Sequence, residues 1–227
     1  MRPDSGGMIA WARERALLLR RAWLNARLDQ TNFSSGLGDS AWALYGLVRS
    51  IKPQVCVEIG SARGKSACYI GAALRDNGGG TLYAIDPHTA TAWNDSQSVE
   101  TLPIMRANLR RFALLPFVEI VRASSGEAAS GWKRPIDLLF IDGDHSYAGV
   151  RQDWELFARH VQPLGAVVFH DTLWDIRPEL GQRADMGVPQ FVDELRTQGY
   201  PVLTLAQNFG VSIVQPTCGG VLLRVPA

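Results

Sequence analysis

One stretch of the chain joins a short apolar run, two glycines and an apolar-periodic segment. It reads VEIGSARGKSACYIGAAL, from Val57 to Leu74. The apolar run predicts a buried strand, Gly60 and Gly64 predict a tight turn, and the segment after them predicts a helix. Glycine lets a ligand approach the backbone closely, and the amino end of a helix offers free N–H groups. The stretch therefore predicts a strand–turn–helix unit with a nucleotide-like ligand at the turn.

Strand-like and helix-like segments alternate through most of the remaining chain. Such alternation predicts βαβ units and an α/β, doubly wound, mostly parallel sheet, here of seven strands. Only residues 207–210 separate the last two strands, which predicts a C-terminal hairpin and an antiparallel strand at the sheet edge. The expected strands are Val55–Ile59, Thr81–Asp86, Phe117–Arg122, Ile136–Asp142, Gly165–Asp171, Pro201–Ala206 and Val211–Gln215, and the expected helices are Lys65–Arg75, Val99–Phe112, Gly126–Ala129, Tyr147–His160 and Pro189–Gln198.

The first part of the chain has a different pattern. Ile9–Leu28 predicts a helix that carries five arginines, and the Ser- and Gly-rich stretch Asn32–Asp39 predicts a loop. We expect residues 1–38 to form a helical extension and residues 39–227 to form one domain. The basic helix is expected to pack on the domain or in a homo-oligomer; a membrane surface or another partner is the alternative.

Composition narrows the classes of function. The formal net charge is only +1, which argues against a nucleic-acid binder. The chain has no run of about 18 apolar residues, so no membrane span is expected. Its N-terminus does not resemble a signal peptide, and a cytoplasmic protein is therefore expected. Cys56, Cys68 and Cys218 lack metal-ligand spacing and are expected to be reduced thiols, with two of them in apolar surroundings.

Three ligands compete for the glycine turn. A phosphate-binding P-loop needs one more residue between Gly60 and Gly64 than this chain has. A dinucleotide site needs a second glycine where Ala62 stands, because backbone must approach the pyrophosphate there. The third ligand is S-adenosylmethionine (SAM), a cation that Glu58 would attract, whereas Glu58 would repel a pyrophosphate. An NAD(P)-dependent enzyme is kept as an alternative.

Further residues extend the expected SAM site. Asp86 ends the second strand, where a carboxylate can accept hydrogen bonds from ribose hydroxyls; a turn residue before Pro87 is the alternative. Ser124 and Ser125 follow the third strand, near the expected adenine position, or simply cap a helix. Together with the polar and glycine residues of the turn and an acid after the fourth strand, the expected cofactor-binding residues are Glu58, Gly60, Ser61, Gly64, Ser66, Asp86, Ser124, Ser125 and Asp142.

Two later strands end in acidic and histidine residues. They lie in the stretches LLFIDGDHSY and GAVVFHDTLW. If these strands are neighbours, Asp142, His170 and Asp171 converge on one cation, with Asp144 and His145 just above it. Carboxylates suit Mg²⁺, whereas an imidazole ligand favours Mn²⁺, Fe²⁺ or Zn²⁺. Turn and capping roles for these acids are the alternative.

The ordered motifs E-I-G-S-x-x-G-x-S, F-I-D-G-D-H-S-Y and V-V-F-H-D-T resemble those of class I SAM-dependent methyltransferases. The nearer resemblance is to small O-methyltransferases and to the cephalosporin hydroxylase-like and sugar O-methyltransferase proteins of natural-product pathways. The resemblance covers about residues 39–215. It implies a Rossmann-like methyltransferase fold, SAM as cofactor, and metal ligands at Asp142, His170 and Asp171.

The resemblance also implies a general base at His145 or at Asp144. We expect methyl transfer to a hydroxyl of a sugar, a phenol or another natural product, assisted by Mg²⁺ or another divalent cation. Trp93, Trp132 and Trp174 are expected either to wall the acceptor pocket or to pack in the core. A non-catalytic SAM-binding protein is the rival class, but it would be expected to lose the acid and base groups that this chain retains.

Overall fold

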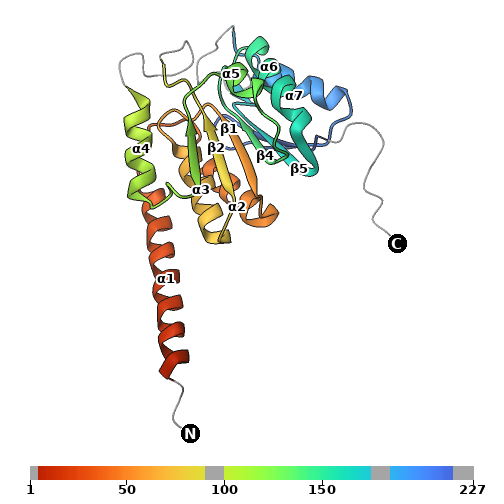
Figure 1. Ribbon diagram of the computed structural model, residues 1–227. Helices are drawn as coiled ribbons and strands as arrows, with labels where there is room; N and C mark the ends of the chain where they lie inside the picture. The colour runs from red at the N-terminus through yellow and green to blue at the C-terminus, as the bar shows by residue number, and fades with distance from the viewer. Residues whose placement is uncertain (1–4, 90–99, 175–184, 217–227) are drawn as a thin grey trace, which may run out of the picture. The chain divides into compact units, whose positions relative to one another are not determined.

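The computed structural model describes residues 5–89, 100–174 and 185–216. Contacts divide the chain into two compact units, Met1–Phe33 and Ser34–Ala227. The second unit is built on a seven-stranded sheet (Figure 1). The elements of the chain are α1 (Ser5–Asp29), a 3₁₀ turn (Gly38–Ser40), α2 (Ala41–Ile51), β1 (Val55–Ile59), α3 (Lys65–Asn77), β2 (Thr81–Ile85), α4 (Thr101–Arg111), β3 (Val118–Val121), α5 (Ser125–Ser130), β4 (Ile136–Ile141), α6 (Tyr147–Phe157), a second 3₁₀ turn (Ala158–His160), β5 (Val161–His170), α7 (Val188–Thr197), β6 (Val202–Leu205) and β7 (Val211–Val214).

The first unit contains the expected basic helix, α1. The Arg15 guanidinium lies 4.7 Å from the centre of the Trp11 ring, and that of Arg27 lies 4.8 Å from the Trp23 ring. These cation–π contacts keep both indole rings beside charged groups on the helix surface. Within the described residues, no helix has the length and apolarity needed to cross a membrane.

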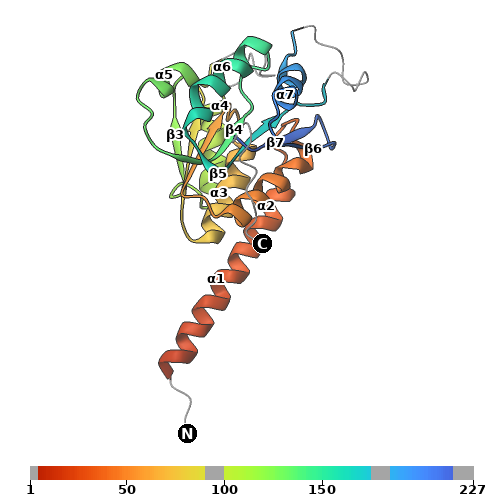
Figure 2. The ribbon, with the colours of Figure 1, turned by 90° about the vertical axis from the view of Figure 1, so that its right-hand side faces the viewer.

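The predicted sheet is confirmed, with strands in the order β3-β2-β1-β4-β5-β7-β6. Every neighbouring pair from β3 to β5 is parallel, and β7 is antiparallel to both β5 and β6. The predicted C-terminal hairpin at the sheet edge is therefore present, with β7 next to β5 and β6 outermost. Val214 of β7 pairs with Val167 on one side and with Val202 on the other, which leaves β6 at the edge (Figure 2).

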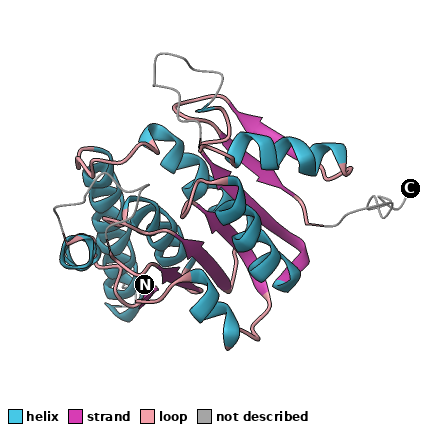
Figure 3. Cartoon of the chain, turned by 90° about the horizontal axis from the view of Figure 1, so that it is seen from above, coloured by secondary structure: helices cyan, strands magenta, loops and turns pink. Residues whose placement is uncertain are grey.

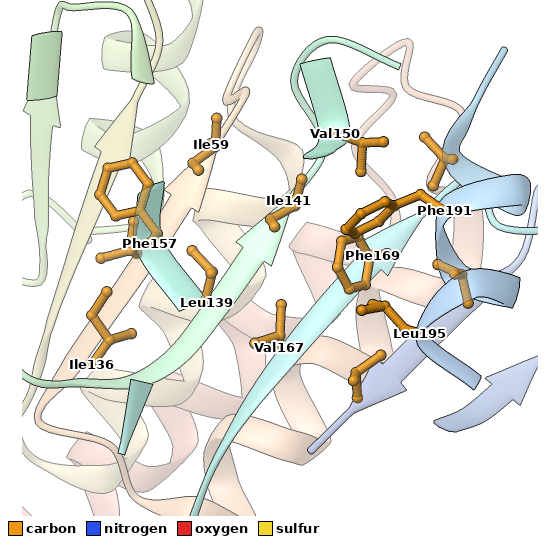
Figure 4. Packing of buried hydrophobic residues seen from close by; sticks show 14 of the residues in the cluster. Ile59, Ile136, Leu139, Ile141, Val150, Phe157, Val167, Phe169, Phe191 and Leu195 are labelled. Atoms are coloured by element: carbon orange, nitrogen blue, oxygen red, sulfur yellow. The ribbon is translucent and has the colours of Figure 1, made fainter. Parts of the chain in front are cut away.

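Helices cover both faces of this sheet, as the view from above shows (Figure 3). On one face, α6 and α7 pack on the alternating side chains of β1, β4 and β5. Phe169 of β5 lies 6.0 Å from Phe191 of α7, centre to centre, in the middle of this apolar layer (Figure 4). Cys56 and Cys68 are buried and unpaired, as predicted, and burial raises the pKa of both thiols. Cys218 and Trp93 lie outside the described residues.

In the unit that contains the sheet, two boundaries differ from the expected ones by three residues or more, and several others by one or two. β5 begins at Val161 and not at Gly165, because Val161 already pairs with Ile136 ahead of an irregularity in the ladder. α6 ends at Phe157, and a 3₁₀ turn takes the chain from there to His160. Neither change moves the carboxyl ends of the strands, where the predicted site residues lie.

Candidate active site

The turn after β1 lies directly against the turn after β4. Gly60 has a φ of +85°, and a Cβ atom there would lie 2.1 Å from the carbonyl oxygen of Asp142. Gly64 has a φ of +81° and precedes α3, where a Cβ would lie 2.7 Å from Cγ of Met105. Both positions require glycine for conformation and for space. The two glycines thus bring the amino end of α3 beside the end of β4.

Glu58 lies beneath this turn and is fully buried. Neither of its carboxylate oxygens has a hydrogen-bond partner within the described part of the chain. Burial raises the pKa of Glu58 to about 8, although the hydroxyls of Ser66 and Ser61 oppose the rise. Two nearby hydroxyls do not offset the cost of ionising a fully buried acid, so a cation close to Glu58 would be favourable.

Asp86, which follows β2, holds the glycine turn in place. Its Oδ2 accepts hydrogen bonds from the backbone N–H groups of Ser61 (2.8 Å) and Ala62 (2.7 Å). Its Oδ1 accepts from the N–H of His88 at 2.6 Å. Ala62 takes a φ of +42°, the left-handed conformation that usually favours glycine. The sequence did not reveal this bracing role, because it joins two turns that lie 25 positions apart; the predicted contact of Asp86 with ribose stays a prediction.

The serines of the expected cofactor site fall into two groups. Ser61 and Ser66 are buried beside Glu58. Ser124 caps α5: its hydroxyl accepts from the N–H of Glu127, and the Glu127 carboxylate accepts from the N–H of Ser124. Ser125 is the first residue of α5. The capping alternative for Ser124 is thus present in the structure, and its contact with adenine stays a prediction.

Four titratable residues meet where β4 and β5 end. Ile141 pairs with Phe169 in the sheet, so Asp142 and His170 come next to each other. The distances within the cluster are 3.1 Å from His170 Nδ1 to Asp142 Oδ1, 3.3 Å from His170 Nδ1 to Asp171 Oδ1, 3.0 Å from His145 Nδ1 to Asp171 Oδ2 and 3.4 Å from His145 Nε2 to Asp142 Oδ1. Asp142, His170 and Asp171 therefore lie together at the strand ends as expected, and His145, expected just above them, contacts both carboxylates.

Opposite charges shift the pKa values within this cluster. Burial lowers the pKa of His170, but the charges of Asp142 and Asp171 outweigh it and raise that pKa. Burial likewise lowers the pKa of His145, and the hydrogen bond to Asp142 and the charge of Asp171 raise it overall. Burial raises the pKa of Asp142, and the two histidines bring it below its ordinary value. The cluster thus stabilises positive charge between two carboxylates.

The same residues suit a divalent cation. Asp142, His170 and Asp171 each offer one possible ligand atom, and these three atoms lie within 4.8 Å of one another. Nε2 of His170 is buried and, among the described residues, has no hydrogen-bond partner, whereas Nδ1 of His170 faces both carboxylates. Two carboxylates and one imidazole form a donor set that Mn²⁺ accepts, while Mg²⁺ favours the carboxylates. The residues fit a metal ion, and its binding stays a prediction.

Asp144 and the tryptophans take separate roles. The Asp144 carboxylate accepts from the N–H of Ser146 at 2.8 Å and so shapes the turn before α6. Trp132 packs in the core, with its ring centre 5.1 Å from that of Tyr83. Trp174 stacks on Phe209 at 4.3 Å, and Phe209 lies with its edge toward His170 at 6.2 Å. Of Trp132 and Trp174, which the structure describes, Trp174 is therefore the one that lies near the acid–histidine cluster, through Phe209.

Two residues beside this cluster, Gly36 and Phe209, were not among the expected site residues. Phe209 lies in the turn between β6 and β7, which was interpreted only as a hairpin connection. A Cβ at Gly36 would lie 2.9 Å from the Phe209 ring and 3.8 Å from Cε1 of His170. Asn208 fixes this segment, because its amide donates to the carbonyl of Leu37 at 3.0 Å. The Asn–Phe–Gly order of the turn was the available signal.

Comparisons with solved structures agree with this fold. An O-methyltransferase from Bacillus cereus in complex with SAH has a TM-score of 0.60 and 16% identity, over 78% of this chain and 80% of that chain. The SAM-bound O-methyltransferase TomG of Streptomyces achromogenes, involved in tomaymycin synthesis, has a TM-score of 0.60 and 16% identity, over 78% and 79%. The SAH-bound methyltransferase PaMTH1 of Podospora anserina has a TM-score of 0.60 and 16% identity, over 95% and 96%.

Sequence comparisons place the chain in a family. A Sinorhizobium fredii protein, uncharacterized protein y4gI, is 28% identical over 156 residues, which make up 66% of this chain and 17% of that relative. This chain thus matches only a small part of that relative's length. The sequence pattern of a family described as a methyltransferase domain matches residues 57–172, which include the glycine turn, Asp86 and the whole acid–histidine cluster. The chain therefore belongs to this methyltransferase-domain family.

Proposed function

We propose that this protein transfers the methyl group of SAM to a hydroxyl of a small molecule, with the help of a divalent cation. One observation carries the proposal: an acid–histidine cluster lies at the ends of β4 and β5, directly against the glycine turn of β1. Gly60 contacts the backbone of Asp142 there. A methyl donor at the turn and an acceptor at the cluster would thus be neighbours, and positioning is a large part of catalysis in a displacement reaction.

The residues around the turn support SAM as the donor. Its sulfonium and ammonium groups are cationic, and Glu58 is a buried acid without a hydrogen-bond partner in the described chain. Asp86 supplies a second acid at the end of β2, beside the same turn. A pyrophosphate at the turn would lie beside Glu58 and would oppose the ionisation of that buried acid, whereas a cation there would favour it, which disfavours ATP or NAD as the ligand.

His145 is the stronger candidate for the general base. Its two ring nitrogens face Asp171 and Asp142, at 3.0 and 3.4 Å. Asp144 instead uses its carboxylate to accept from the N–H of Ser146. A base must be neutral to take a proton, so the rate should rise with pH through the pKa of His145, which the two carboxylates raise.

The metal would be held by Asp142, His170 and Asp171. When bound, it supplies a positive charge that lowers the pKa of an acceptor hydroxyl and orients it. Beside these residues, Trp174 and Phe209 offer a stacked pair of rings. An aromatic wall of this kind suits the flat or apolar face of a phenol, a sugar or another cyclic natural product.

The proposal is tested with labelled SAM, Mg²⁺ and a panel of phenols, sugars and cyclic natural products. We expect one acceptor class to take up label, and calorimetry to show SAM binding without comparable binding of ATP or NAD. His145→Ala should lower kcat by roughly 10²–10⁴ at unchanged SAM affinity, since general-base catalysis typically contributes that much. If Asp144→Asn abolishes turnover and His145→Ala does not, Asp144 is the base. SAM binding without label transfer to any acceptor would favour a non-catalytic binding protein.

A further inference from the structure

The start of α7 contacts the turn that carries His145. The backbone N–H of Gly187 donates a hydrogen bond of 2.8 Å to the carbonyl oxygen of His145. Gly187 immediately precedes α7, whose first residue is Val188. This bond joins a residue of the β4–α6 turn to an element that lies 42 positions later in the chain. It fixes the backbone of His145 without touching its ring.

Gly187 also leaves no room for a side chain. A Cβ there would lie 2.1 Å from the backbone nitrogen of Tyr147 and 2.3 Å from its Cα. The φ of Gly187 is −120°, a conformation that any residue can adopt. Glycine is therefore needed for the close approach alone, and a larger residue would push the 145–147 backbone away from α7.

Tyr147 adds side-chain contacts to the same helix. Its hydroxyl lies 2.7 Å from Oε2 of Glu194 and donates to it, and its ring meets that of Phe191 edge-on at 6.1 Å. Phe191 is part of the buried layer beneath α7. The turn is thus attached to the core through α7 as well as to the strand β4 that precedes it.

We infer that Gly187, together with the Tyr147–Glu194 pair, positions the His145 ring between Asp142 and Asp171. The inference depends on the proposed function, in which His145 accepts the proton. The ring contacts both carboxylates, and its reach to the two of them at once depends on where the turn holds its backbone. Displacing a catalytic group by about 1 Å costs on the order of 10²-fold in rate. None of the three positioning residues needs to touch SAM or the acceptor.

A first experiment observes the ring directly and needs no substrate. The chain has four histidines, so ¹H–¹³C spectra of histidine-labelled protein contain four ring environments. The signal that disappears in His145→Ala identifies His145. We expect this signal to move in Gly187→Ala while the His88 and His160 signals stay. Gly46→Ala is the matched control, because a Cβ at Gly46, in α2, would meet nothing within 4 Å. An unmoved His145 signal in folded Gly187→Ala would overturn the inference, whatever the activity.

A second experiment measures the coupling by kinetics. Gly187→Ala should lower kcat about 100-fold and leave the Kd of SAM unchanged. In a His145→Ala background the same substitution should cause no further loss, because the group that it displaces is already gone. Losses that add in the double variant would show a merely structural role and refute the inference. If Gly187→Ala fails to fold, Tyr147→Phe removes only the hydroxyl bond to Glu194 and should show a smaller loss with the same non-additivity.

The two experiments separate this inference from the proposed function. If His145→Ala keeps the wild-type kcat, His145 is not the base and the proposed role of that residue fails. The spectra would still report whether Gly187 sets the position of the His145 ring. A moved ring with no kinetic consequence would therefore contradict the catalytic role alone, and an unmoved ring would contradict the positioning role.

Discussion

Glu58 makes the stability of the protein depend on pH in a specific way. Burial raises the pKa of its carboxyl to about 8 in the folded protein, against an ordinary value of 4.5. Between these two values the unfolded chain has released the proton, while the folded protein still binds it. The unfolded state then binds fewer protons than the folded state, so the free energy of unfolding falls as pH rises. The contribution is fully favourable below pH 4.5 and is lost by about pH 8.

The size of the effect follows from the same window. Each pH unit inside it changes the free energy of unfolding by about 1.4 kcal/mol. A titration from pH 5 to pH 8 should therefore remove about 4 kcal/mol from the wild type through this one residue. Glu58→Gln keeps the shape of the side chain and has no proton to lose. Its stability relative to wild type should thus improve by about 4 kcal/mol over the same range.

Urea unfolding of the ligand-free protein at several pH values between 5 and 8 measures this difference. Glu119→Gln makes the same chemical change on an exposed side chain of β3 and serves as the control. As pH rises from 5 to 8, the wild-type and Glu58→Gln curves of unfolding free energy should separate in favour of Glu58→Gln. Parallel curves would show that Glu58 is ionised in the folded protein, and the argument from burial would be wrong.

Three further outcomes are expected. Asp86→Ala should weaken SAM binding by about 1.5–3 kcal/mol, from loss of a ribose contact and of the bonds that hold the turn; equal affinity by calorimetry would contradict the ribose assignment. EDTA treatment should abolish turnover and leave SAM binding largely intact, whereas full activity of metal-free protein would leave Asp142 and Asp171 without a metal role. Gly60→Ala should destabilise the protein to urea more than Gly78→Ala, because both have a left-handed φ (+85° and +87°) but only Gly60 faces backbone within 4 Å.

The sequence by itself determined the order of elements and which residues follow each strand. Apolar runs of strand length, helical periodicity and glycines mark the βαβ units, because these patterns depend on residues a few positions apart. Asp86, Asp142 and His170 could therefore be assigned to strand ends from the sequence. The hairpin could be predicted as well, but the position of β7 between β5 and β6 could not. That order depends on which edge of β5 the returning strand pairs with, and local pattern does not record it.

Only the tertiary structure decided which strand ends meet and at what distance. The pairing of Ile141 with Phe169 brings Asp142 beside His170, and β1 next to β4 brings Gly60 onto the Asp142 backbone. The bracing of the glycine turn by Asp86 and the bond from Gly187 to His145 are likewise contacts between distant parts of the chain. Each arises from strand register and helix packing, in which a side chain's partner is set by the fold as a whole and not by its neighbours in sequence.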